Sequence, residues 1–69
     1  MVMKRLRRAR LAAGYTQEEM GRKLGLTMAG YRQKEVGERK ITVEEAARIA
    51  EILGTSMDDI FLTDSHQND

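Results

Sequence analysis

Each break in the chain is marked by a glycine that a threonine or serine soon follows. The pairs are Gly14 with Thr16, Gly25 with Thr27, Gly37 with Thr42, and Gly54 with Ser56. Glycine suits the left-handed residue just past a helix end, and a hydroxyl accepts hydrogen bonds from the free N–H groups of the next helix. Thr16 with Glu19 and Thr42 with Glu45 also form full capping boxes. The pattern predicts five short helices, at about residues 3–13, 17–24, 28–36, 43–53 and 57–62.

Apolar residues inside these segments recur at helical spacing, and no segment alternates with the period of two that a strand would show. We therefore expect an all-α fold in which residues 1–62 form a compact five-helix cluster, followed by a disordered polar tail at 63–69. The expected core residues are Leu6, Ala9, Ala13, Tyr15, Met20, Leu24, Leu26, Tyr31, Ile41, Val43, Ala46, Ala47, Ala50, Leu53, Met57, Ile60 and Phe61.

A length of 69 residues without cysteine limits how the fold is stabilised. Domains of this size often depend on disulfides or a metal. Neither is expected here, because His66 is the only histidine and has no second ligand at metal spacing. The longest apolar run is far shorter than the roughly 18 residues of a membrane span, and the basic start lacks the apolar region of a secretion signal. We expect a cytoplasmic protein without cofactor or metal, stabilised by packing, capping and optionally a partner subunit.

The net charge of +1 conceals an asymmetry between the two halves of the chain. Residues 1–40 carry eleven Lys and Arg against four Glu, a balance of +7, and residues 41–69 carry one Arg against seven acids, a balance of −6. Such a chain can present a basic face to a polyanion, but ordinary solvated helices have the same composition. A basic transit peptide is discounted, because its cleavage would remove the first helix. Charge alone therefore does not distinguish a polyanion-binding face from ordinary solvated helices.

The second and third predicted helices form a helix-turn-helix at about 17–36. Only Gly25, Leu26 and Thr27 separate Leu24 from Met28. Gly21 lies inside the second helix, where glycine is unfavourable by about 1 kcal/mol relative to alanine. We expect the missing side chain at Gly21 to let the third helix cross closely over the second.

Several motifs resemble the phage repressor and Cro (Xre) family of helix-turn-helix proteins, over about residues 4–62. They are Leu6-Arg7-Arg8-Ala9-Arg10, Gly14-Tyr15-Thr16-Gln17-Glu18-Glu19-Met20-Gly21, Leu24-Gly25-Leu26-Thr27, Tyr31, Glu35, Gly37, Ile49-Ala50, Leu53-Gly54 and Ser56-Met57-Asp58-Asp59-Ile60-Phe61. The resemblance implies a lambda-repressor-like domain that binds double-stranded operator DNA, usually as a symmetric homodimer, with the third helix in the major groove. It also implies a structural salt bridge between Arg10 and Glu35.

Two positions depart from the family pattern. The family usually has an apolar or aromatic residue where this chain has Lys34, and many relatives have proline where it has Ile41. We expect the aliphatic stem of Lys34 to cover the core edge while its ammonium reaches water.

The resemblance implies that the third helix contacts DNA, and helical rotation predicts which of its side chains face outward. With Tyr31 and Glu35 turned inward, the opposite face of the third helix carries Ala29, Arg32, Gln33 and Val36. Gln33 can bond to adenine, and Ala29 with Met28 at the helix tip can contact thymine methyl groups, although Met28 could instead fill the core. Phosphate contacts are expected from Gln17 and Thr27 at helix N-termini, and from Arg39 and Lys40 in the following loop.

The sequence otherwise carries little chemistry. The adjacent carboxylates Glu44-Glu45 and Asp58-Asp59 diverge on their helices, and no zinc motif, phosphate-binding glycine loop or activated nucleophile is present. An enzyme is therefore not expected. The predicted function is sequence-specific DNA binding by a transcriptional regulator, with any protein partner unknown. Two alternatives are a DNA-binding antitoxin whose acidic half or tail contacts a toxin, and a protein-interaction module that kept the scaffold and lost DNA binding.

Overall fold

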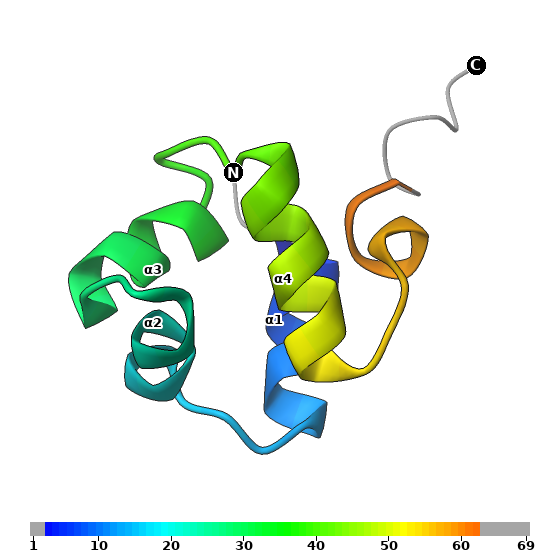
Figure 1. The fold of residues 1–69 in the computed structure, drawn as a ribbon, viewed down its shortest axis with the longest axis horizontal. Coiled ribbons are helices and arrows are strands. Elements are labelled where there is room, and N and C mark those ends of the chain that lie inside the picture. The colour runs from blue at the N-terminus through cyan, green and yellow to red at the C-terminus, as the bar shows by residue number, and fades with distance from the viewer. Residues whose placement is uncertain (1–2, 63–69) are drawn as a thin grey trace.

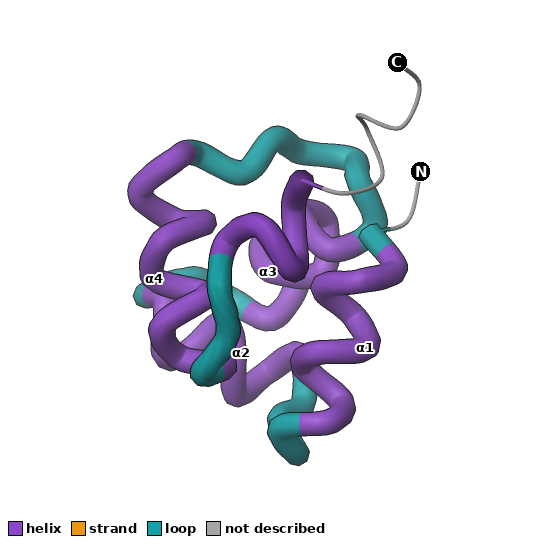
Figure 2. The backbone as a smooth tube through the Cα atoms, turned by 90° about the vertical axis from the view of Figure 1, so that its right-hand side faces the viewer, coloured by secondary structure: helices purple, strands orange, loops and turns teal. Residues whose placement is uncertain are grey.

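The structure is a computed structural model that describes residues 3–62. Its four α-helices are α1 (Lys4–Ala12), α2 (Gln17–Leu24), α3 (Met28–Glu35) and α4 (Val43–Leu53), followed by a short π-helical turn, η1 (Asp58–Leu62). Figure 1 shows α1 and α4 in the middle of the molecule, with α2 and α3 on one side and η1 on the other. Short loops join these elements, and the described residues include no strand (Figure 2).

Side-chain caps explain where three of the helices begin. The hydroxyl oxygens of Thr16 and Thr42 accept hydrogen bonds from the N–H groups of Glu19 and Glu45, and each glutamate returns a bond to the N–H of its threonine. Thr27 caps α3 by accepting from the N–H of Gly30 at 3.0 Å. These caps satisfy N–H groups that have no partner inside the helix. The expected all-helical fold of five helices is confirmed.

The hydrophobic core receives side chains from every helix. Its buried members are Leu6, Met20, Leu24, Tyr31, Ile49, Ala50 and Ile60. Partly buried apolar residues pack around them, among them Tyr15, Leu26, Ile41 and Phe61. Because each short element contributes only one or two of these residues, none can bury its apolar face alone, and the five elements depend on one another for stability.

The buried face of α4 differs from the predicted one. Val43 is 77% exposed, and Ala47 is exposed too, whereas Ile49 is fully buried. Val43 follows the capping residue directly, so it lies at the helix end before α4 reaches the core. The buried stripe therefore contains Ala46, Ile49 and Ala50.

Two other residues that were expected in the core are exposed in the structure. Ala13 and Met57 are exposed, because each lies in a connection next to a helix end. The predicted tail at residues 63–69 lies outside the described residues.

Gly21 allows a close backbone approach between α2 and the turn. A Cβ atom at this position would lie 2.8 Å from the carbonyl oxygen of Thr27 and 3.1 Å from that of Leu26. The neighbouring Gly25 has a φ of 75° and ends α2 in the left-handed conformation. The missing side chain at Gly21 thus makes room for the turn that leads into α3, rather than for the body of α3.

Candidate nucleic-acid interface

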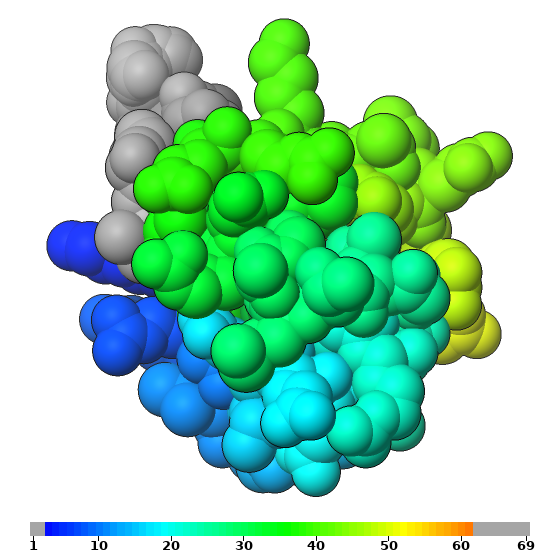
Figure 3. All heavy atoms as spheres, turned by 90° about the vertical axis from the view of Figure 1, so that its left-hand side faces the viewer, coloured from blue at the N-terminus to red at the C-terminus, as the bar shows by residue number. Residues whose placement is uncertain are grey.

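One face of α3 is held inside the protein and the other is accessible. Tyr31 is fully buried and Glu35 is 1% exposed. Ala29 and Arg32 are exposed on the opposite side, and Gln33 is partly buried. Seen from the α3 side (Figure 3), α3 and the loop after it occupy the middle of the molecular surface, with α2 below them and part of α1 at one edge.

The tip of α3 presents an apolar side chain to solvent. Met28 is the first residue of the helix and is 52% exposed, so it does not fill the core. Ala29 beside it is exposed as well. Thr27 is exposed and uses its hydroxyl oxygen as the cap acceptor, which leaves the hydroxyl proton free to be donated elsewhere. The start of α3 therefore combines two apolar groups with a hydrogen-bond donor.

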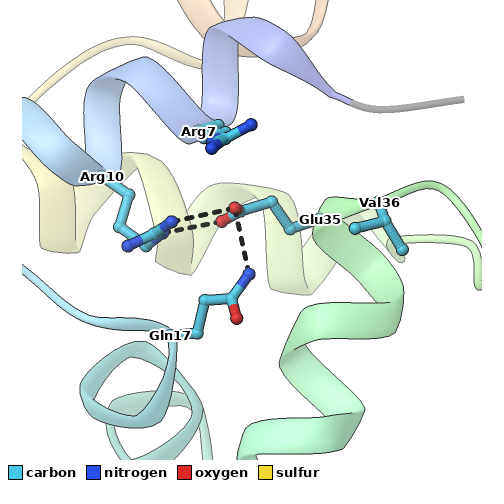
Figure 4. Close-up of a pocket in the computed structure, with 5 residues that line it drawn as sticks. All are labelled: Arg7, Arg10, Gln17, Glu35 and Val36. Atoms are coloured by element: carbon cyan, nitrogen blue, oxygen red, sulfur yellow. Dashed lines mark hydrogen bonds and ion pairs between the residues drawn. The ribbon is translucent and has the colours of Figure 1, made fainter.

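A buried carboxylate fixes the inner side of α3. The Nε of Arg10 donates to Oε1 of Glu35 at 2.8 Å and one terminal nitrogen donates to Oε2 at 3.0 Å, so that this ion pair is bidentate (Figure 4). The hydroxyl of Tyr31 donates to Oε1 of Glu35 at 2.7 Å. The other terminal nitrogen of Arg10 donates to the carbonyl oxygen of Tyr15 at 2.8 Å. The structure thus joins α1, α3 and the turn before α2 through Arg10 and Glu35.

The protonation of this cluster follows from its contacts. Burial alone would raise the pKa of Glu35, but hydrogen bonds from Arg10 and Tyr31, together with the charge of Arg10, hold that pKa below its ordinary value. The hydrogen bond to Glu35 raises the pKa of Arg10. Burial, and then the hydrogen bond to Glu35, raise the pKa of Tyr31. At neutral pH the cluster therefore consists of a carboxylate, a guanidinium and a neutral phenol.

Gln17 connects this cluster to the surface. Its side-chain nitrogen donates to Oε2 of Glu35 at 3.3 Å (Figure 4), while its main chain begins α2. An amide nitrogen carries two protons, so one remains for a further acceptor. Sequence reasoning assigned Gln17 to phosphate alone and missed its bond to Glu35.

Gln33 and Arg39 lie close together. A terminal nitrogen of Arg39 donates to the side-chain oxygen of Gln33 at 3.5 Å. The N–H groups of Glu38 and Arg39 both donate to the main-chain carbonyl of Gln33, at 2.8 and 3.1 Å. The loop therefore folds back on the end of α3, with the side chains of Arg39 and Lys40 exposed.

The expectation that the Lys34 ammonium reaches water is wrong. Lys34 is only 7% exposed. Its Nζ donates to the carbonyl oxygen of Lys40 at 2.9 Å and lies 3.0 Å from Oε1 of Glu45. These two acceptors replace water around the ammonium, and so the group can remain inside the protein.

Arg7 is a further cation at this face that sequence reasoning did not select. With Arg10, Gln17, Glu35 and Val36 it lines a cavity of about 350 Å³ (Figure 4). Arg7 is exposed and comes one helical turn before Arg10, a spacing of three that places both side chains on one side of α1. That spacing was the available signal, but the cavity itself depends on three elements that are distant in sequence.

The described part of the chain offers neither a metal-binding cluster nor a membrane-spanning helix. Residues 3–62 contain no cluster of histidine, cysteine, aspartate or glutamate that could hold a metal ion. Within the same range, no helix has the length and apolar character needed to cross a bilayer.

Comparisons with known proteins agree with the geometry of α2 and α3. A family model described as "Helix-turn-helix" matches residues 6–60. The chain is also similar to the SPbeta prophage-derived uncharacterized HTH-type transcriptional regulator YonR of Bacillus subtilis (strain 168), with 34% identity over 58 residues. The match covers 84% of this chain and 54% of the relative, so the chain spans about half the length of that protein. No solved structure matches the chain.

Proposed function

The chain belongs to the helix-turn-helix family, of the phage repressor and Cro (Xre) type, and from this we propose that it is a transcriptional regulator that places α3 in the major groove of double-stranded DNA. One observation carries the proposal. The buried cluster around Glu35 fixes the inner face of α3, while Met28, Ala29 and Arg32 remain exposed on its outer face. A helix held in this way can enter the groove with its base-contacting side chains already in place.

The proposed contacts divide into base readout and backbone binding. The carboxamide of Gln33 matches the donor and acceptor pattern of adenine, and the apolar groups of Met28 and Ala29 suit a thymine methyl. We therefore expect A/T base pairs within the recognised site, with Arg32 on the same face. Gln17, Thr27, Arg39 and Lys40 are the proposed contacts to phosphate, and they fix the position of the protein without reading sequence.

The proposal includes a symmetric assembly. One helix-turn-helix reads only a few base pairs, so we propose that two copies bind half-sites about 34 Å apart. The family is typically non-enzymatic, and the proposed activity is binding alone. A prophage-derived relative favours a cytoplasmic protein of prokaryotic or phage origin.

Selection of bound sites from random DNA, followed by binding measurements over about 50 to 200 mM salt, tests the function. We expect an enriched inverted repeat rich in A/T, and an affinity whose logarithm falls linearly with the logarithm of salt concentration. Each phosphate contact adds about 0.9 to the slope. Failure to enrich any sequence, together with binding that does not depend on salt, would favour a protein-interaction module instead.

A further inference from the structure

A lysine ammonium is buried where α3, the loop that follows it and α4 meet. Lys34 has only two partners within reach of its Nζ among the described residues, the carbonyl oxygen of Lys40 at 2.9 Å and the carboxylate of Glu45 at 3.0 Å. Lys34 is 7% exposed, in a protein whose other described lysines are all exposed. The proposed base and phosphate contacts do not use this group.

Fold stability alone does not account for a lysine at this position. Removing an ammonium from water is costly, and well-packed apolar side chains in place of a buried ion pair are often as stable or more stable. The lysine adds a directional bond that an apolar residue cannot make. That bond ends on the main-chain carbonyl of Lys40, which is one of the proposed phosphate contacts and directly follows another, Arg39.

The same carboxylate also fixes the end of the loop. Oε1 of Glu45 accepts the N–H of Thr42 at 3.0 Å and faces the ammonium of Lys34 at 3.0 Å. Lys34 and Glu45 together therefore hold the chain at Lys40 and at Thr42, on both sides of Ile41. The start of the loop is hydrogen-bonded to the end of α3, so both halves of the loop are anchored while its basic side chains stay exposed.

We propose that Lys34 is a positioning residue for DNA backbone binding, which holds the loop so that Arg39 and Lys40 reach phosphates together. This inference rests on the proposed function and adds the means by which the loop is ordered before binding. A loop that is ordered in the free protein avoids part of the entropy cost of ordering long side chains on DNA. Lys34 itself acts through the loop and does not touch the nucleic acid.

The test compares Lys34→Met with Lys23→Met, a matched loss of one charge from an exposed lysine on α2. Binding is measured on a selected duplex and on an unrelated duplex across the salt range given above. Lys34→Met should weaken binding to both duplexes by about tenfold, because two long side chains must then be ordered on binding. It should also lower the salt slope by about 0.9 for each phosphate contact that is lost. Lys23→Met should change neither quantity to this extent.

A double-mutant comparison separates positioning from general destabilisation. In a background that carries Arg39→Ala and Lys40→Ala, Lys34→Met should cause no further loss of affinity. In the free protein, hydrogen exchange of the loop amides at 37–41 should be faster in Lys34→Met than in the wild type. If Lys34→Met does not fold, Glu45→Gln is measured in the same way, because it keeps an acceptor for the N–H of Thr42 and removes the charge opposite Lys34.

Two different failures can be told apart. A wild-type chain that binds no duplex in a salt-dependent way overturns the proposed function, and the role of Lys34 with it. A wild type that binds as proposed, together with a Lys34→Met variant of equal affinity and equal slope, overturns only the role of Lys34. Equal loss in the wild-type and the double-alanine backgrounds would also overturn it.

Discussion

Glu35 is the residue on which α1, α2 and α3 converge. It accepts hydrogen bonds from Arg10, Tyr31 and Gln17, and its main-chain carbonyl accepts the N–H of Met3 at 2.9 Å. One side chain therefore fixes the orientation of α3 and the position of Gln17. Loss of its charge should affect stability first, and DNA binding as a consequence.

Glu35→Gln should destabilise the fold at neutral pH by about 3 to 5 kcal/mol, because the buried Arg10 loses the charge that compensates it. Urea unfolding measures the change. Glu38→Gln is the matched control, since it removes the same charge from an exposed position. A Glu35→Gln variant that unfolds at the wild-type urea concentration would contradict this role for the ion pair.

The lowered pKa of Glu35 also determines how the free energy of unfolding depends on pH. The folded pKa of Glu35 lies below its ordinary value, so the stabilisation is present above the unfolded value of about 4.3 and is lost as the pH falls through the folded pKa. The hydrogen bond from the N–H of Thr42, opposed by burial and supported by Lys34, lowers the pKa of Glu45 too, and its contribution has the same sign. The difference in unfolding free energy between wild type and Glu35→Gln should therefore stay constant above the unfolded pKa and shrink as the pH falls below it toward the folded pKa. A difference that does not shrink there would assign the effect to packing rather than to charge.

Gln33 and Arg39 should differ in what their loss does to DNA recognition. Gln33→Ala should cost about 1 to 3 kcal/mol on the best site and relax base preference at one position in each half-site. Arg39→Ala should weaken all sequences similarly and lower the salt slope by about 1. Selected-site profiles of the two variants provide the comparison.

The 3.5 Å contact between these two side chains adds one refinement. Arg39 can help to orient the carboxamide of Gln33, so Arg39→Ala should also relax preference slightly at the Gln33 position and nowhere else. Lys40→Ala, which leaves that contact intact, is the control. An unchanged profile for Gln33→Ala with a broadly altered one for Arg39→Ala would mean that α3 does not lie in the groove as proposed.

Within the helix-turn-helix element, Gly21→Ala tests the close approach of the turn. Alanine is favoured by about 1 kcal/mol in a helix interior, but here its Cβ would lie 2.8 Å from a main-chain oxygen of Thr27. Because backbone must move to relieve that contact, we expect a net loss of about 1 to 2 kcal/mol in the free energy of unfolding. Gly30→Ala should be milder, since its Cβ would meet the side-chain oxygen of Thr27 at 3.2 Å. Thermal or urea unfolding of both variants measures these changes. A Gly21→Ala variant more stable than the wild type would contradict the close approach of the turn to Gly21.

Helix boundaries could be predicted where the cap is local. The predicted bounds 17–24 and 43–53 match α2 and α4, because Thr16 and Thr42 lie next to the helices that they cap. The first helix was predicted one residue too long at each end. Met3 makes no side-chain cap, and a hydrogen bond to Glu35, far along the chain, holds its N–H instead.

The details that sequence reasoning missed depend on contacts between elements. Periodicity assigned Val43 to the core face of α4 and left out Ile49, because a helix end can satisfy the spacing without reaching the core. The acceptors of Lys34 come from the loop and from α4, so a pattern within α3 cannot reveal them. The outer face of α3 was accessible to prediction since it depends only on helical rotation about Tyr31 and Glu35.

At the scale of the whole molecule, the described residues near the C-terminal end offer little exposed apolar surface for a contact between two protomers. Of the apolar residues at 52 and 57–62 that could form a contact between two protomers, Ile60 is buried in the core, and Ile52 and Phe61 are partly buried against it. Met57 is 37% exposed, and the side chain of Leu62 lies outside the described part. Stable interfaces bury about 1,200 to 2,000 Å². We therefore expect a monomer in free solution and two protomers only on DNA.

Sedimentation of the free protein and of its complex with a selected operator tests this assembly. Met57→Glu should weaken binding to a full inverted repeat and leave binding to a single half-site unchanged, because only the full site brings two copies together. Leu11→Glu, a matched change at an exposed apolar residue on α1, should affect neither. A free dimer would require an interface other than this one, and one protomer per operator would rule out the symmetric assembly. Loss of half-site binding in Met57→Glu would instead show that the substitution disturbs the fold. Met57 directly precedes η1, and η1 packs against α1.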